Sequence, residues 1–186
     1  MTDAPEDNFE AGTPAGDVTV STTPVPLTLR PFADERVPEG QTGISAFLGD
    51  RMIARNTFPT EFIERIPLDK VFETPVPLVF HATETGPGIQ GTLYAVVPAD
   101  LLEAEEEEPE PWAASLPRYE DAITEEDTGE SADIHAMFPL GVLVRMRRDR
   151  KYPGDLAREA GDLLHTVLTG RTHEPIDRVL DDLLNP

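Results

Sequence analysis

The sequence predicts an α+β fold, in which a small, mostly antiparallel sheet carries two amphipathic C-terminal helices on one face. Three observations lead to this class. Segments rich in β-branched and apolar residues occur at 18–30, 76–97 and 136–147. Apolar residues recur every three or four positions after Asp155. The 19 prolines and 13 glycines interrupt the chain too often for a helical bundle.

The 186 residues fit a single domain, and their charge is distributed unevenly. The net charge is −21; residues 1–17 hold five acidic and no basic side chains, and residues 100–133 hold 14 acidic side chains against Arg118. Residues 136–186 are neutral, with eight of each sign. We therefore expect an acidic N-terminal arm at 1–17 and one domain over 18–186 with an acidic insertion at 100–133. These blocks are either solvated segments or docking surfaces for a basic partner. The acidity, with 13 arginines against two lysines, fits salt adaptation or a GC-rich genome.

The first elements are a strand and a repeated motif. Residues 17–22 alternate and are β-branched, which predicts a strand. The sequence Thr-Pro-Val-Pro-Leu then occurs at 23–27 and again at 74–78. Prolines at alternate positions cannot donate backbone hydrogen bonds, so each copy should enter an edge strand or run as an extended segment into a strand. Chance and structural duplication both remain open as the origin of this repeat.

The middle of the chain predicts a helix, a helical turn and a hairpin. Apolar residues at 44, 47, 48 and 52 indicate a short helix over 43–55. A further turn is expected over 58–66, with Thr60 as its cap and Pro67 as its end. Strands at 76–82 and 91–97 should pair through the turn around Gly86-Pro87-Gly88.

The C-terminal third combines an irregular block, a strand and two helices. Residues 103–133 are acidic and proline-rich, and should be irregular. A core strand over 136–147 follows, and the stripe after Asp155 predicts a helix that ends at Gly170. Thr172 is a plausible cap for a second helix, whose apolar face carries Ile176, Val179, Leu180, Leu183 and Leu184.

No catalytic, cofactor or metal site is expected. The chain has no cysteine, and Gly43-Ile44-Ser45-Ala46-Phe47 lacks the second glycine of a nucleophile elbow. No phosphate-binding glycine loop occurs, the acidic residues around Gly129 do not fit a calcium loop, and the four histidines lack ligand spacing. No apolar run reaches membrane-spanning length, and the acidic N-terminus does not resemble a secretory signal. We therefore expect a location in a virion or in the cytoplasm.

Two groups of residues are candidates for partner binding. Trp112 and Tyr119 lie within the acidic block, where they could anchor in a partner's pocket or fold back onto the core. The second group is basic and falls within seven positions: Arg145, Arg147, Arg148, Arg150 and Lys151. This group could protect a strand edge, neutralise residues 103–133, or contact an acidic partner or nucleic acid. A net charge of −21 repels phosphate, so direct nucleic-acid binding is not expected.

These observations favour a non-enzymatic structural or assembly subunit of a larger protein complex. Its partners would be other protein subunits in a homo- or hetero-oligomer, docked for example by β-strand addition. Among such complexes we expect the head–tail junction or tail of a tailed virus. The alternative is an acidic adaptor or regulatory protein that binds a basic partner or mimics nucleic acid.

Overall fold

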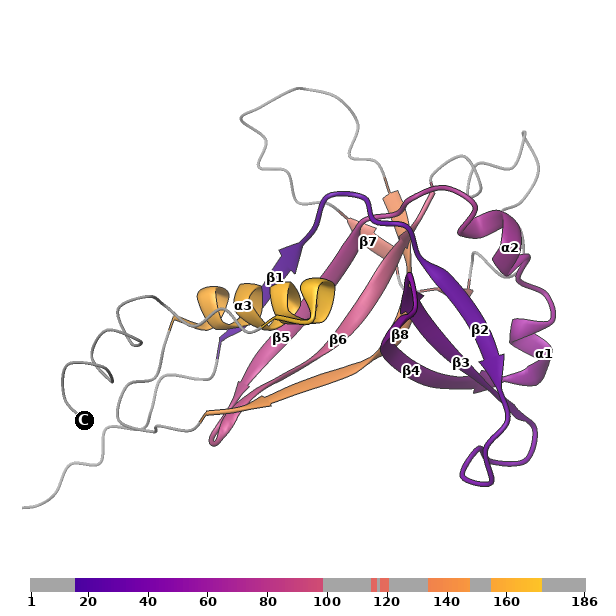
Figure 1. Ribbon diagram of the computed structural model, residues 1–186, viewed down its shortest axis with the longest axis horizontal. Helices are drawn as coiled ribbons and strands as arrows, with labels where there is room; N and C mark the ends of the chain where they lie inside the picture. Colours follow the sequence, from indigo (N-terminus) through magenta and orange to yellow (C-terminus); the bar gives the residue numbers. More distant parts are fainter. Residues whose placement is uncertain (1–15, 99–114, 117, 121–133, 148–154, 172–186) are drawn as a thin grey trace, which may run out of the picture.

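The computed structural model describes residues 16–98, 115–116, 118–120, 134–147 and 155–171. These residues form two antiparallel sheets with few helices (Figure 1). The larger sheet has five strands in the order β1-β5-β6-β8-β7, and the smaller has three in the order β2-β3-β4. The strands are β1 (Asp17–Ser21), β2 (Thr28–Phe32), β3 (Gln41–Leu48), β4 (Arg51–Pro59), β5 (Leu78–Thr85), β6 (Gly88–Val97), β7 (Arg118–Glu120) and β8 (Ile134–Met146).

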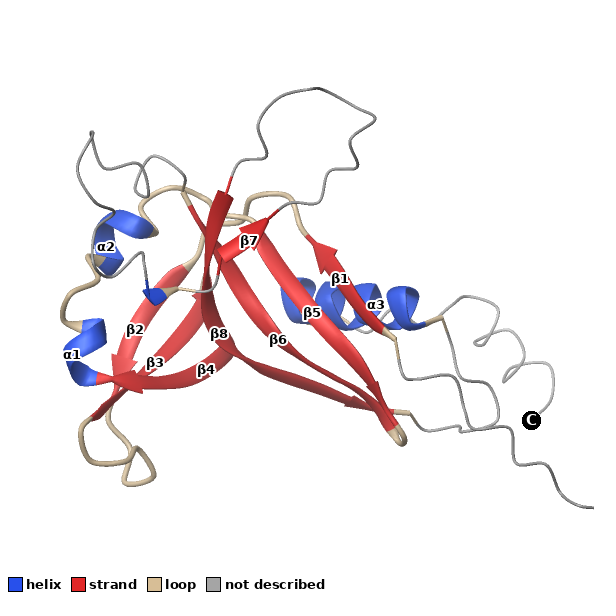
Figure 2. Ribbon diagram, turned by 180° about the vertical axis from the view of Figure 1, so that it is seen from behind, coloured by secondary structure: helices blue, strands red, loops and turns tan. Residues whose placement is uncertain are grey.

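The longest described helix covers one face of the five-stranded sheet. Helix α3 (Leu156–Thr169) packs on β1, β5 and β6. Figure 2 views the sheet from the other side, where no described helix lies over β1, β5, β6 and β8. Two one-turn helices, α1 (Thr60–Ile63) and α2 (Leu68–Val71), connect the two sheets. The five-stranded sheet therefore has one covered and one open face.

One hydrophobic core joins both sheets and α3. It includes Ile44 and Phe58 from the smaller sheet, Phe80 and Phe138 from the larger sheet, and Leu164 from α3. The rings of Phe58 and Phe138 lie 5.0 Å apart between their centroids, which joins β4 directly to β8. The described residues thus share a single core, as one folding unit does.

The two Thr-Pro-Val-Pro-Leu motifs pair with each other. Val25 and Val76 form an antiparallel bridge with reciprocal backbone hydrogen bonds, of 2.9 Å from the Val25 amide and 3.0 Å from the Val76 amide. The prolines flank these valines, at positions where the missing amide costs the bridge nothing. The first copy leads into β2 and the second into β5, in agreement with the extended runs that the sequence predicts.

The helix predicted over residues 43–55 is wrong, because this segment forms the hairpin of β3 and β4. Gly49, with a φ of 60°, occupies the tight turn in a left-handed conformation that suits glycine. The register shifts between Ala46 and Phe47, so apolar residues do not alternate along β3. This irregularity produced the spacing that resembled a helical stripe.

Other predictions were confirmed or corrected locally. The 17–22 strand and the hairpin around Gly86 are present, although the hairpin strands extend to Thr85 and Gly88. Residues 28–32 do not join β1, β5, β6 and β8 in one sheet but belong to the smaller sheet. Thr60 does not cap α1, since its hydroxyl bonds that of Thr42, and Pro67 precedes α2. Residues 118–120 form β7 within the block expected to be irregular.

The predicted helix after Asp155 is confirmed as α3. The Asp155 carboxylate accepts a hydrogen bond from the Ala157 amide, and Gly170 ends the helix in a left-handed conformation. Ala160 and Leu164 are buried against the sheet. The second predicted C-terminal helix, from Thr172 onwards, lies outside the described residues, as do residues 1–15 of the acidic arm and most of the acidic insertion.

Candidate docking surface on strand β8

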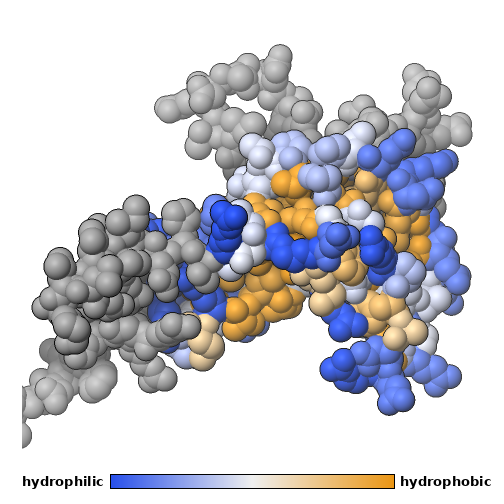
Figure 3. Space-filling model, in the orientation of Figure 1, coloured by the Kyte–Doolittle hydropathy of each residue, from blue (hydrophilic) through white to orange (hydrophobic). Residues whose placement is uncertain are grey.

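Strand β8 exposes a row of apolar side chains toward solvent. Val142, Val144 and Met146 alternate along the strand and are 60%, 56% and 60% exposed. Alternate residues of a strand point to the same face, so these three side chains lie together on the open face of the five-stranded sheet. Figure 3 views the molecule from the α3 side and shows hydrophobic surface below α3; the open face that carries the three side chains lies on the far side of this view. Exposed apolar residues in a contiguous row are typical of an interaction site.

The backbone of the same residues faces an unpaired edge. Within the described residues, β8 pairs with β6 on one side and with β7 only at Ile134–Ala136 on the other. The Arg147 amide donates to the Pro87 carbonyl at 2.9 Å, toward the β5–β6 hairpin. Backbone groups alternate in direction along a strand, so those of residues 142, 144 and 146 point away from β6. Residues 142–146 therefore offer both hydrogen-bonding groups and apolar side chains.

Strand β4 limits this open edge to the C-terminal part of β8. The Asn56 side-chain amide donates to the Pro139 carbonyl at 3.1 Å. A Cβ atom on Gly141 would lie 2.5 Å from the Arg55 carbonyl oxygen, so glycine permits the close approach of the two strands. Residues 139–141 are thus covered, and the accessible edge begins at Val142.

Among the described strands, β1, β7 and β2 also lie at the outside of a sheet, and they are protected in ways that β8 is not. Strand β1 points the polar residues Asp17, Thr19 and Ser21 to the open face, and β7 has only three residues. Strand β2 contains Arg30 and Pro31, and proline cannot donate to an added strand. Proteins use charge, proline and short length to prevent edge pairing. The open face of β8 carries none of these features at residues 142–146.

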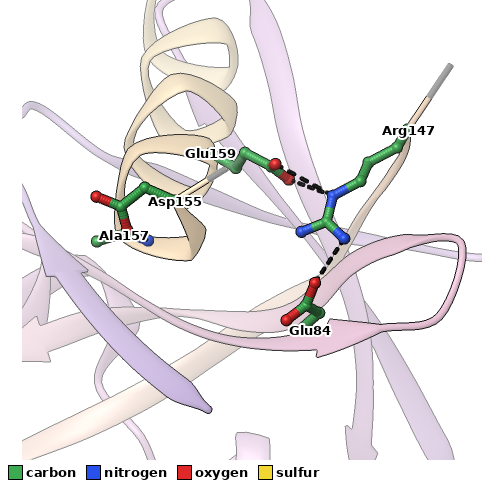
Figure 4. A network of polar contacts seen from close by, with 5 residues as sticks. All are labelled: Glu84, Arg147, Asp155, Ala157 and Glu159. Atoms are coloured by element: carbon green, nitrogen blue, oxygen red, sulfur yellow. Dashed lines mark hydrogen bonds and ion pairs between the residues drawn. The ribbon is translucent and has the colours of Figure 1, made fainter. Parts of the chain in front are cut away.

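An ion-pair network fixes the end of β8 from its covered face (Figure 4). The Arg147 guanidinium donates to the Glu159 carboxylate on α3 at 2.9 and 3.1 Å, and to the Glu84 carboxylate on β5 at 2.6 Å. These bonds raise the pKa of Arg147 further above its ordinary value, with Glu159 contributing most. The Arg147 side chain is only 12% exposed. This network holds the end of β8 in a defined position next to α3.

A second arginine connects α3 to the smaller sheet. Arg51 at the start of β4 donates to the backbone carbonyls of Thr166 and Leu168 in the last turn of α3. The Thr166 carbonyl also accepts a hydrogen bond from the amide of the C-cap residue Gly170 at 2.7 Å. A cation at this end of a helix interacts favourably with the helix dipole. Both ends of α3 are therefore tied to strands, at Arg147 and at Arg51.

The residues that the sequence nominated for partner binding fall into three groups. Trp112, Arg148, Arg150 and Lys151 lie outside the described residues. The backbone of Tyr119 belongs to β7, beside the opposite end of β8. Arg145 lies on β8, and Arg147 directly follows the strand, with its guanidinium bound within the chain. The ion-pair partners of Arg147, Glu84 and Glu159, do not belong to the acidic insertion at 100–133.

The sequence analysis did not predict that the apolar row on β8 is exposed. The segment Val142-Leu143-Val144-Arg145-Met146-Arg147 alternates, and such a pattern normally places its apolar side chains inside. Here the order is reversed, because Arg147 faces α3 whereas Val144 and Met146 face solvent. The signal available in the sequence was this alternation of arginine with large apolar residues at the end of a strand.

The described residues hold no group of three or more histidine, cysteine, aspartate or glutamate side chains that could bind a metal ion. His81 is exposed on β5, and its Nδ1 atom lies 2.9 Å from the Thr19 hydroxyl. Among the helices that the structure describes, none has the length and apolar character needed to cross a membrane.

Comparison with known proteins provides no relative from which a role could be transferred. No protein-family model matches the chain, and no significant match was found among curated proteins or among solved structures.

Proposed function

We propose that this chain is a non-enzymatic structural or assembly subunit of a larger protein complex, and that it docks a neighbouring subunit on β8. The observation that supports this function is the edge of β8 at residues 142–146. Val142, Val144 and Met146 are each more than half exposed, and their backbone groups point away from β6. An extended segment added here would gain backbone hydrogen bonds and cover the three apolar side chains, which is how β-strand addition works.

The contacts that hold β8 in place suit a strand that binds a partner. A docking strand must keep its shape while it is unoccupied, otherwise binding would include the cost of ordering it. Strand β8 pairs along its length with β6 and is held by Arg147 to α3 and β5. The edge is thus preorganised for an added strand.

The size of the complex in cells tests this function. Cell extracts containing the tagged chain should be fractionated by native size, with the chain detected by its tag. The unmodified chain should elute in particles larger than two copies, and Val144→Lys should elute as free protein because a lysine at this position disfavours strand addition. Ser21→Lys on the polar β1 edge is the matched control and should behave as the unmodified chain. Elution of the unmodified chain as a monomer or dimer would refute the assembly function.

The kind of complex stays a prediction. A tailed-virus particle, with this chain at the head–tail junction or in the tail, remains our expectation from the sequence. The genes beside the coding sequence test it, because a run of portal, capsid and tail genes would support a viral particle and its absence would count against one. The adaptor alternative rests on acidic segments that lie mainly outside the described residues.

A further inference from the structure

We propose that the first occupant of the β8 edge is a second copy of this chain, paired antiparallel about a two-fold axis at Val144. This inference rests on the proposed docking function of β8 and names the partner. The two five-stranded sheets would become continuous across the axis. In a two-fold interface the same surface meets itself, so the edge must be complementary to its own inverted copy.

The edge meets this requirement in its backbone and in its side chains. In antiparallel pairing, residues whose backbone groups point outward face each other as hydrogen-bonded pairs. With the axis at Val144, the two Val144 residues pair with each other, and Val142 of each copy pairs with Met146 of the other. All three exposed apolar side chains of each copy would then lie against apolar neighbours. Cross-strand apolar pairs of this kind stabilise sheets.

Repulsion between arginines and the contact of β4 with β8 favour this register over the other two-fold symmetric registers. An axis at Arg145 would place the two Arg145 residues directly opposite each other, and an axis at Met146 would place Arg145 opposite Arg147 of the second copy. Like charges directly opposite are destabilising. An axis at Val142 or at Leu143 would require pairing along part of residues 138–141, where β4 covers β8. The axis at Val144 confines the pairing to residues 142–146 and puts Arg145 of each copy opposite Leu143 of the other. The two Arg145 residues then lie diagonally across the pair and not directly opposite each other.

The interface is small, and this sets its expected strength. One five-residue edge buries less than the roughly 800 Å² per partner of a standard stable interface. We therefore expect a concentration-dependent dimer with a dissociation constant on the order of micromolar. Each copy carries a net charge of −21, so the copies repel each other at low ionic strength. Salt screens this repulsion, and dimerisation should strengthen as salt is raised.

Single-cysteine variants test the register directly, because the chain has no cysteine of its own. With the axis at Val144, the Cα atoms of the two copies at this position would be about 5.5 Å apart, within the range of a disulfide. Val144→Cys should therefore cross-link to itself under mild oxidation. Val142→Cys should not, since its two copies would lie about 14 Å apart, but it should cross-link to Met146→Cys in a mixture of the two variants. Ser21→Cys on β1 is the control and should remain uncross-linked.

Light scattering on size-exclusion eluates should show a rising dimer fraction with concentration and salt. Val144→Lys should raise the dissociation constant by about tenfold or more, because two lysines would meet at the axis, whereas Ser21→Lys should leave it unchanged. Circular dichroism checks that the variants fold. A monomer at every concentration and salt, or equal cross-linking of all single variants, would overturn the two-fold dimer. The docking function would survive that result if Val144→Lys still prevented entry into the cellular complex, so the two failures are distinguishable.

Discussion

Replacing Arg147 with methionine should destabilise the fold by about 2–3 kcal/mol. The substitution leaves the carboxylates of Glu84 and Glu159 close together without their shared cation. Removing one partner of a fully buried ion pair costs about 3–5 kcal/mol, whereas exposed pairs contribute about 0–1 kcal/mol. The side chains of Glu159 and Glu84 keep 19% and 34% of their surface exposed, so water screens part of the repulsion and the loss should fall between these limits.

Urea unfolding followed by circular dichroism measures this loss. A decrease of about 2–3 kcal/mol should lower the urea midpoint by about 1–1.5 M, given a slope of about 2 kcal/mol/M for a chain of this size. Arg158→Met, which removes an exposed arginine of α3 beside Glu159, is the matched control and should change stability by less than about 0.5 kcal/mol.

A triple variant separates charge from packing. Combining Arg147→Met with Glu84→Gln and Glu159→Gln removes every charge of the network, and should recover at least half of the lost stability. If Arg147→Met were no less stable than Arg158→Met, the network would not fix the end of β8. If the triple variant recovered nothing, the loss would come from packing and not from unpaired carboxylates.

Three further perturbations test other parts of the fold. Arg51→Ala should lower stability by about 1 kcal/mol and reduce amide exchange protection in the last turn of α3; unchanged exchange there would contradict its capping role. Gly141→Ala should lower stability by about 1–3 kcal/mol in thermal unfolding, since the added methyl group meets the β4 backbone, and an unchanged midpoint would show that the strands can separate. The Arg36 side chain lowers the pKa of Asp34 well below its ordinary value of about 3.9, so a carboxyl NMR titration should find Asp34 ionised at pH 3. Because the folded pKa is lowered, the stabilisation is present above about pH 4 and is lost as pH falls; Asp34→Asn should lack this acid dependence.

The arginines at the end of β8 and the apolar side chains beside them have different partners. The sequence singled out its arginines as partner-binding candidates, and the described contacts instead commit Arg147 to Glu84 and Glu159. Within the described residues, the features available to a partner are the apolar side chains on the open face and the outward-pointing backbone groups of residues 142, 144 and 146. Specificity would therefore come from strand register and shape more than from charge.

Local signals in the sequence were sufficient for the hairpin of β5 and β6 and for α3. The turn around Gly86 and the apolar stripe between the caps Asp155 and Gly170 depend on residues close together in the sequence, and the structure agrees with both. The β3–β4 hairpin was not predictable in this way. Its register shift at Ala46 breaks the two-residue period, and periodicity is the signal on which strand prediction depends.

The sequence by itself determined that an antiparallel, proline-interrupted β structure is followed by an amphipathic helix, because periodicity, turns and caps act over a few residues. Only the tertiary structure decided that residues 28–32 join a separate sheet, that the two Thr-Pro-Val-Pro-Leu motifs pair, and which face of β8 is open. A strand's alternation defines two faces but does not say which one another element will cover. That choice follows from α3 packing on one face and drawing Arg147 inward, through contacts with Glu159, 12 residues away, and Glu84, 63 residues away. The apolar side chains of Val142, Val144 and Met146 are left facing solvent as a result.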